Sequence, residues 1–135
     1  MYAIKAEVRD PRARTFAFVA QKTMYAGKRV AAGDTIFVFA SENEGGQGLV
    51  ARGVVASVAP VARTPGIARQ TPRVSLVIEG AVPARRRLGR DELKRFADWD
   101  DGRPQTELNF KFYRQATDKL VGLSARAAAF LDTFF

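Results

Sequence analysis

Apolar side chains recur at every second position along much of this chain. In the first such run Tyr2, Ile4, Ala6 and Val8 alternate with charged residues, beginning with Lys5. This alternation predicts a half-buried β-strand, because successive side chains of a strand point to opposite faces. The same period predicts further strands within residues 16–20, 50–58, 74–82 and 108–112.

Another strand is predicted at Thr35–Phe39, which is apolar on both faces and therefore suits the centre of a sheet. The Gly33-Asp34 pair before it is a turn signal, since glycine tolerates positive φ and aspartate can bond its own backbone. Ser41 and Asn43 belong to the polar cluster that follows, ahead of a glycine-rich stretch. The sequence thus predicts a polar, flexible loop at the end of a buried strand.

Two helices are predicted. Residues 89–97 place Leu93 and Phe96 on one face, and the C-terminal region begins with Ser124 as a capping residue. Apolar residues then recur at helical spacing, at Ala127, Phe130, Leu131 and Phe134. The longest loops are expected at residues 59–73 and 98–106.

Six strands, glycine-rich turns and about two helices indicate a mainly β fold with flanking α structure. We expect a single domain over residues 1–135, built as a small, mostly antiparallel β-barrel. A parallel βαβ architecture needs a crossover helix between most strands, and the sequence leaves no room for these helices.

The absence of two residue types excludes several kinds of catalytic and metal site. The chain contains no cysteine and no histidine, so the common zinc sites and the Ser-His-Asp triad are excluded. No apolar run approaches the roughly 20 residues of a membrane-spanning helix, and we expect no membrane partner. The first ten residues lack the apolar core of a secretory signal, which favours a cytoplasmic location.

The formal net charge is +8, and the excess is concentrated in the middle of the chain. Residues 46–97 carry ten Arg or Lys side chains against three Asp or Glu side chains. A basic segment of this kind is typical of a protein that binds polyanions. A solvated, arginine-rich surface explains the same numbers, so both interpretations stay open.

The order of these elements resembles the PUA-like superfamily, and within it the EVE and ASCH domains. The resemblance is carried by Gly33-Asp34, the apolar strand Ile36–Phe39, and Ser41 and Asn43 after it. EVE domains also show a basic residue before the turn, for which Lys28 or Arg29 is available, but the N-terminal tryptophan of their pattern is missing here. The resemblance implies a PUA-like barrel that reads nucleic acid, in some members through a modified base flipped into a pocket.

The predicted strand at residues 108–112 supplies the main candidate for a binding site. If its apolar residues face the core, then Asn109, Lys111 and Tyr113 share the polar face. Such a face can bond a base edge, stack a ring and neutralise a phosphate, unless it is a plain solvated face. We expect a pocket between it and the loop that holds Ser41 and Asn43.

Further candidates lie outside this strand. Trp99 is a candidate for stacking a base, although a tryptophan also serves as a core plug. The acidic residues around it suit either a divalent cation or a solvated turn, and we predict no metal site. Phosphate contacts are predicted in the densest basic run, with two more upstream, at Arg85, Arg86, Arg87, Lys22 and Arg29.

The sequence therefore predicts a non-catalytic domain that binds nucleic acid or a nucleotide without a cofactor, and the resemblance implies that the bound base can be a modified one. One alternative is an ASCH-like enzyme acting on a nucleoside-like substrate, with Lys22, Tyr113 and Glu42 in its pocket. Another is a partner-binding module without a pocket. The sequence does not distinguish DNA from RNA, and it leaves the oligomeric state open.

Overall fold

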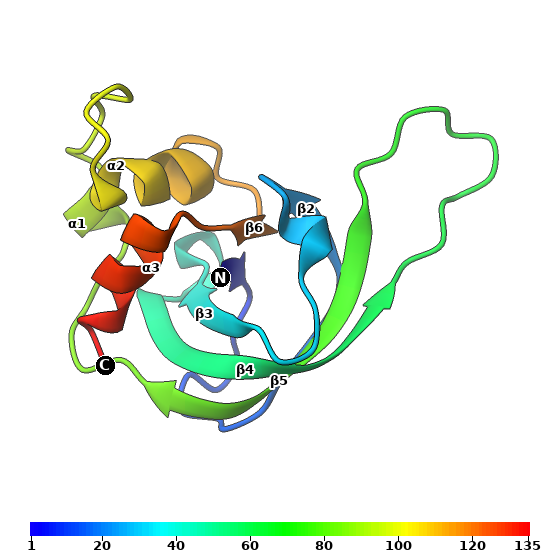
Figure 1. Cartoon of the computed structure of the whole chain (residues 1–135), viewed down its shortest axis with the longest axis horizontal. Coiled ribbons are helices and arrows are strands. Elements are labelled where there is room, and N and C mark those ends of the chain that lie inside the picture. The colour runs from blue at the N-terminus through cyan, green and yellow to red at the C-terminus, as the bar shows by residue number, and fades with distance from the viewer.

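Six strands close into a barrel in the computed structural model, which describes all 135 residues (Figure 1). Around the barrel the strands run in the order β1-β3-β4-β5-β2-β6. Their bounds are β1 Tyr2–Ala6, β2 Phe16–Met24, β3 Thr35–Ala40, β4 Gly48–Pro60, β5 Arg73–Pro83 and β6 Lys119–Gly122.

The barrel is mixed. β1 pairs in parallel with β3, where Ile4 lies opposite Val38, and β2 pairs in parallel with β6, where Thr23 lies opposite Leu120. The other four pairs are antiparallel. The predicted mainly β barrel is confirmed, and the two parallel pairs follow from the long connections that bring β3 beside β1 and β6 beside β2.

The longer helical segments gather on one side of this barrel (Figure 1). The short 3-10 turns are η1 Gly27–Arg29 and η2 Glu42–Glu44. The longer segments are α1 Arg90–Leu93, α2 Pro104–Asn109, which continues as the π-helical η3 Phe110–Arg114, and α3 Ala125–Asp132. No helix in the structure is both long enough and apolar enough to pass through a membrane.

Two apolar cores result, one inside the barrel and one between its outer wall and the helices. Ile4, Val38 and Leu120 belong to the inner core. Phe37 and Phe39 belong to the outer core, where α2, η3 and α3 cover them. β3 is therefore buried on both faces, as its continuous apolar sequence predicts.

The prediction of a strand at residues 108–112 is wrong, because this segment is helical in α2 and η3. Leu108 and Phe112 are both fully buried and lie one helical turn apart. Pro104 opens α2 at the first helical turn, where its missing N–H costs nothing. The true last strand, β6, was missed, and the predicted helix over residues 89–97 is the shorter α1.

The predicted C-terminal helix is confirmed as α3. The Ser124 hydroxyl accepts a hydrogen bond from the Ala127 N–H over 3.1 Å, which is the expected N-cap geometry. Leu131 is fully buried in the outer core, whereas Phe130 is only half-buried.

Lys5 departs from the alternation in β1, which predicts it on a solvated face. Both Lys5 and its cross-strand partner Lys119 are fully buried. The Lys5 Nζ donates to the carbonyl oxygens of Phe112 and Ala116 over 2.7 and 3.0 Å, and the Lys119 Nζ donates to that of Gln115 over 2.8 Å. The two amines thus satisfy carbonyls left free at the end of η3.

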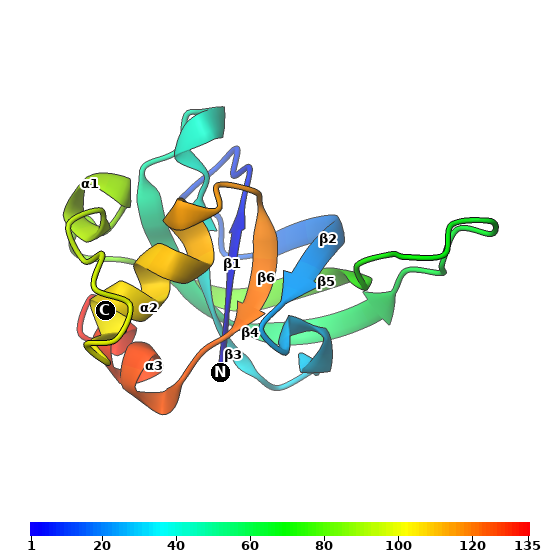
Figure 2. The same cartoon turned by 90° about the horizontal axis from the view of Figure 1, so that it is seen from above.

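The loop between β4 and β5, residues 61–72, projects from the barrel on the side away from the helices (Figures 1 and 2). We call this loop the arm. It corresponds to the long loop predicted over residues 59–73.

Candidate nucleic-acid interface

Two exposed aromatic side chains share a pocket beside α2. The pocket has a volume of about 400 Å³ and takes in Tyr25 from the turn after β2 and Trp99 from the loop before α2. Trp99 is 74% exposed and Tyr25 is 48% exposed, so neither ring is a core plug. The pocket is also lined by Arg103, Glu107, Phe110 and Lys111.

The backbone at Tyr25 is strained. Tyr25 and Ala26 both adopt the left-handed region, with φ values of 51° and 64°. Two glycines make this turn possible, because a Cβ atom at Gly27 would lie 2.2 Å from the Leu120 carbonyl oxygen and one at Gly122 would lie 2.5 Å from the Tyr25 carbonyl oxygen. Strained backbone of this kind persists where the surrounding structure fixes it, often at functional sites.

Lys111 joins Tyr25 to α2. Its Nζ donates to Glu107 Oε2 over 3.0 Å and to the Gly122 carbonyl oxygen over 2.7 Å, and it lies 5.1 Å from the centre of the Tyr25 ring. Burial alone would raise the pKa of Glu107, but hydrogen bonds from Ser124 and Lys111 outweigh it and hold this pKa below its ordinary value. The carboxylate therefore stays ionised and anchors the lysine at the wall of the pocket.

The loop that carries Trp99 is held at its far end. Asp101 accepts hydrogen bonds from the Arg103 N–H over 2.9 Å and from the Thr106 hydroxyl over 3.0 Å. These contacts, chiefly the one from the Arg103 backbone, lower the pKa of Asp101. No group of three or more metal-ligating side chains converges anywhere in the structure.

A second hollow of about 400 Å³ adjoins the first and shares Tyr25 and Lys111 with it. Arg29 lines this second hollow, together with residues of β1 and β6. The structure therefore brings three of the predicted site residues, Trp99, Lys111 and Arg29, to neighbouring hollows around Tyr25.

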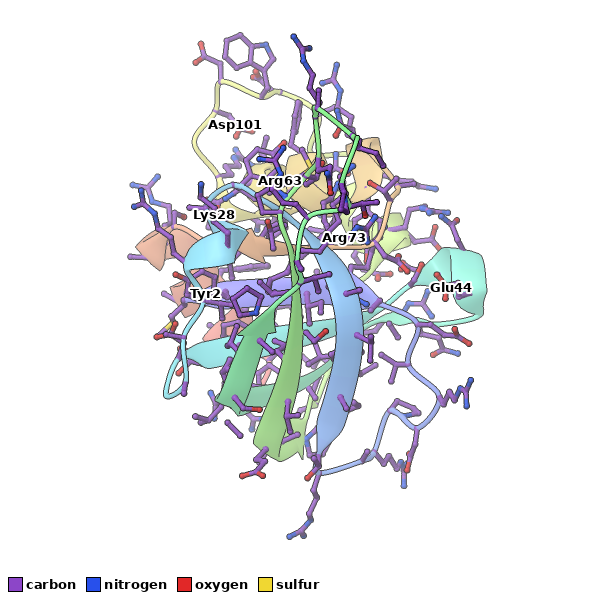
Figure 3. All side chains as sticks on the ribbon, turned by 90° about the vertical axis from the view of Figure 1, so that its right-hand side faces the viewer. Tyr2, Lys28, Glu44, Arg63, Arg73 and Asp101 are labelled. Carbon is purple, nitrogen blue, oxygen red and sulfur yellow. The ribbon has the colours of Figure 1, made fainter.

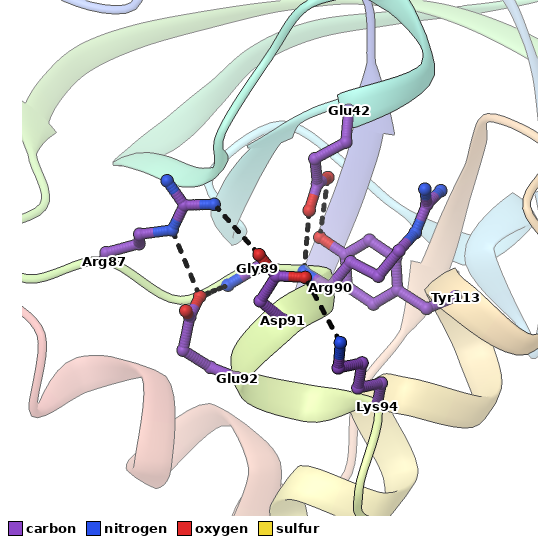
Figure 4. A network of polar contacts seen from close by, with 8 residues as sticks. All are labelled: Glu42, Arg87, Gly89, Arg90, Asp91, Glu92, Lys94 and Tyr113. Carbon is purple, nitrogen blue, oxygen red and sulfur yellow. Dashed lines mark hydrogen bonds and ion pairs between the residues drawn. The ribbon is translucent and has the colours of Figure 1, made fainter.

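Tyr113 lies elsewhere, against the loop that follows β3, as Figure 4 shows. Its hydroxyl donates to Glu42 Oε1 over 3.1 Å, and Glu42 Oε2 accepts the Arg90 N–H over 2.6 Å. The Arg90 guanidinium also donates to Asn43 Oδ1 over 3.1 Å. Burial, followed by the negative charge of Glu42, raises the pKa of Tyr113 far above its usual range.

Tyr113 thus lies against the loop that holds Ser41 and Asn43, but it contacts Glu42 directly, and none of the five main hollows of the surface is lined by Tyr113, Ser41 or Asn43. Tyr113 and Ser41 are buried, and the Ser41 hydroxyl has no hydrogen-bond partner. Asn109 is buried as well and donates to the Phe96 carbonyl oxygen over 3.0 Å. These residues do not share a strand face with Lys111, since their segment is helical, and their roles in binding stay predictions.

The three arginines at residues 85–87, which were predicted to contact phosphate, bond to other parts of the chain. Arg85 and Arg86 donate to backbone oxygens of the segment that follows α3, those of Phe135 and Thr133. Arg87 pairs with Glu92 over 3.4 Å, as shown in Figure 4. Their contact with phosphate stays a prediction.

Lys22, another predicted phosphate contact, lines a groove at the base of the arm. Tyr25 was missed as a site residue, although the sequence Tyr25-Ala-Gly-Lys-Arg29 places an aromatic ring beside a glycine turn and two cations.

The whole chain is similar in structure to two solved human structures. One is the DUF55 domain of human thymocyte nuclear protein 1, with a TM-score of 0.64 and 11% identity over 98% of this chain and 96% of that one. The other is human THYN1 protein in complex with 5-methylcytosine containing DNA, with a TM-score of 0.61 and 11% identity over 98% and 95%. No family model matches the sequence, and no curated protein sequence matches it. At this identity the likeness concerns the fold alone, and this fold is the small barrel with flanking helices that the resemblance to the PUA-like superfamily predicts.

Proposed function

We propose that this chain is a non-catalytic nucleic-acid-binding domain that holds an unpaired base between Trp99 and Tyr25. The observation that carries the proposal is the pocket in which both exposed rings meet the cations Arg103 and Lys111. Stacking of a base on an aromatic side chain contributes about 1–3 kcal/mol, and nearby cations attract the phosphates that flank the base.

The likeness to a human protein solved with 5-methylcytosine containing DNA supports a modified base as the ligand. Phe110 gives the pocket an apolar wall, and the guanidinium of Arg114 lies 4.6 Å from the centre of its ring. A methyl group on a pyrimidine adds apolar surface that this wall can cover. Burying one such group is worth about 0.8 kcal/mol, or roughly fourfold in affinity.

Trp99 is the only tryptophan of the chain, which makes its fluorescence a direct probe of the proposed pocket. Single-stranded DNA carrying cytosine or 5-methylcytosine should quench this fluorescence in a saturable manner, and the methylated strand should do so at lower concentration. Tyr25→Ala should weaken binding by about 1–3 kcal/mol, because one stacking surface is lost.

Val54→Ala is the matched control, since it truncates an exposed apolar side chain on β4 outside the pocket. This variant should bind as the wild type does. Binding without quenching of Trp99, or equal affinity of the Tyr25→Ala variant, would rule out the base pocket. Absence of any binding to DNA or RNA would rule out the proposed function.

A further inference from the structure

The arm forms a groove with η1 and the end of β2. The groove has a volume of about 560 Å³, and its walls contain five basic side chains and no acidic one. They come from three separate segments of the sequence and are Lys22, Lys28, Arg63, Arg69 and Arg73. Figure 3 faces the arm and shows Lys28, Arg63 and Arg73 around its base.

None of these five side chains pairs with a carboxylate. Lys22, Lys28 and Arg69 make no side-chain hydrogen bond either, so their full charge is available to a ligand. In this respect these three side chains differ from the arginines at residues 85–87, which bond to backbone oxygens after α3 or to Glu92. The arm groove therefore brings together five basic side chains whose charge no carboxylate neutralises.

The groove has a defined shape, because the arm is held by its own side chains. The Gln70 amide spans the loop, accepting from the Thr64 N–H over 2.8 Å and donating to the Thr64 and Ile67 carbonyl oxygens. Arg63 donates to the Ala68 carbonyl oxygen over 3.0 Å, and Arg73 donates to that of Ala20 over 2.7 Å. Each guanidinium keeps further N–H donors that can face a ligand.

η1 connects this groove to the proposed base pocket. Its residue Lys28 lines the arm groove, while the next residue, Arg29, lines the hollow that contains Tyr25 and Lys111. A strand whose base lies at Tyr25 can therefore continue across η1 into the groove. Basic side chains that follow one path are the expected footprint of a phosphate backbone.

We infer that the arm groove holds the phosphate backbone of the same nucleic-acid strand, next to the base that occupies the Trp99–Tyr25 pocket. This inference rests on the proposed function and extends it. It assigns a second contact surface, which binds the phosphate backbone whatever the base sequence of the nucleic acid. Each phosphate contact releases counterions, so the groove contributes mainly to the salt dependence of binding.

The test is the slope of the logarithm of the binding constant against the logarithm of the salt concentration. Wild type and the triple variant Lys22→Gln, Lys28→Gln, Arg69→Gln are titrated with 5-methylcytosine DNA, in single-stranded and duplex form, and the form that binds more tightly is used for the salt series. None of these three side chains makes a hydrogen bond or an ion pair within the chain. If all three bind phosphates, the slope should decrease in magnitude by about 2–3.

A second triple variant, Arg9→Gln, Arg14→Gln, Arg95→Gln, removes the same charge from exposed positions that do not line the groove. It should retain the wild-type slope. An unchanged slope in the groove variant, or an equal change in both variants, would overturn the inference.

Trp99 fluorescence separates this result from that of the proposed function. A smaller slope with full quenching at saturation supports both the groove and the base pocket. A smaller slope without quenching in the wild type supports the groove alone, and quenching with an unchanged slope supports the pocket alone. A wild-type protein that binds neither form overturns both.

Discussion

Lys5 and Lys119 lie opposite each other across the β1–β6 pair, and both are fully buried under the end of η3. Neither amine has a carboxylate within ion-pair distance, and both donate to carbonyl oxygens of the helical segment above them. Burial lowers the pKa of both lysines, and that of Lys119 falls from 10.5 to about 8. The barrel wall and the helical layer are thus joined by groups whose charge depends on pH.

Stability should rise with pH between about 8 and 10. In this range an unfolded Lys119 still binds a proton while the folded one loses it, so the unfolded state binds more protons and deprotonation favours folding. We expect a gain of about 2 kcal/mol in the free energy of unfolding, measured by urea denaturation. Above about pH 10 the trend should reverse, because the raised pKa of buried Tyr113 keeps it protonated only in the folded state.

Lys119→Met provides the control for this pH dependence. It removes the titrating amine and should remove most of the rise, whatever it does to stability at pH 7. A wild-type protein whose stability is flat from pH 8 to 10 would show that Lys119 titrates normally.

Tyr113 and Glu42 should stabilise the loop after β3 together. Tyr113→Phe removes one hydrogen bond and should cost about 0.5–1.5 kcal/mol. Glu42→Ala should cost more, about 1–3 kcal/mol, because the Arg90 N–H also loses its acceptor. A double-mutant cycle in urea should give a coupling close to the Tyr113→Phe value, and Tyr25→Phe, at an exposed ring, should have little effect. Additive losses would mean that this hydrogen bond is not formed.

Gly27 should tolerate no side chain. Its added Cβ would meet the backbone of β6, which cannot move without disturbing the barrel, so Gly27→Ala should cost about 3 kcal/mol. Gly66→Ala makes the same chemical change in the arm, where a Cβ meets nothing and only a φ of +83° opposes it. That variant should cost about 1 kcal/mol. Thermal unfolding of both variants checks the difference, and equal losses would refute the close approach of η1 to β6.

Leu131 should contribute more to stability than Phe130, its neighbour in α3. Leu131 is fully buried in the outer core, so Leu131→Ala should cost about 2–5 kcal/mol. Phe130 is half-buried, and Phe130→Ala should cost about 1–2 kcal/mol. The order would be reversed in urea denaturation if α3 packed through its other face.

The barrel could be predicted from the sequence because its long strands show either alternating apolar and polar residues or a continuous run of apolar residues. The failure at residues 108–112 has a simple cause. Leu108 and Phe112 are four residues apart, and this spacing fits two repeats of a strand as well as one turn of a helix. Pro104 was the residue that favoured the helix. β6 has only four residues and starts with a buried lysine, so it gives no clear period.

The candidate site was less accessible to sequence reasoning. Trp99 and Lys111 were identified by their chemistry, but Tyr25 is exposed by a left-handed turn that no periodicity reveals. The arginines at residues 85–87 look free in the sequence, and only the long-range contact with α3 shows that two of them have partners. The groove at the arm is formed by segments about 40 residues apart, which only the closed barrel brings together.

The position of β6 between β1 and β2 determines when this barrel can close. β6 is formed by residues 119–122, whereas its two neighbours are among the first strands of the chain. During synthesis on the ribosome, both of these earlier strands therefore keep one unpaired edge until residues 119–122 have emerged. Such edges can pair with other chains, and pairing between distant segments slows folding. A nascent chain halted before residue 119 should consequently be prone to aggregation, even though most of its core residues are already present.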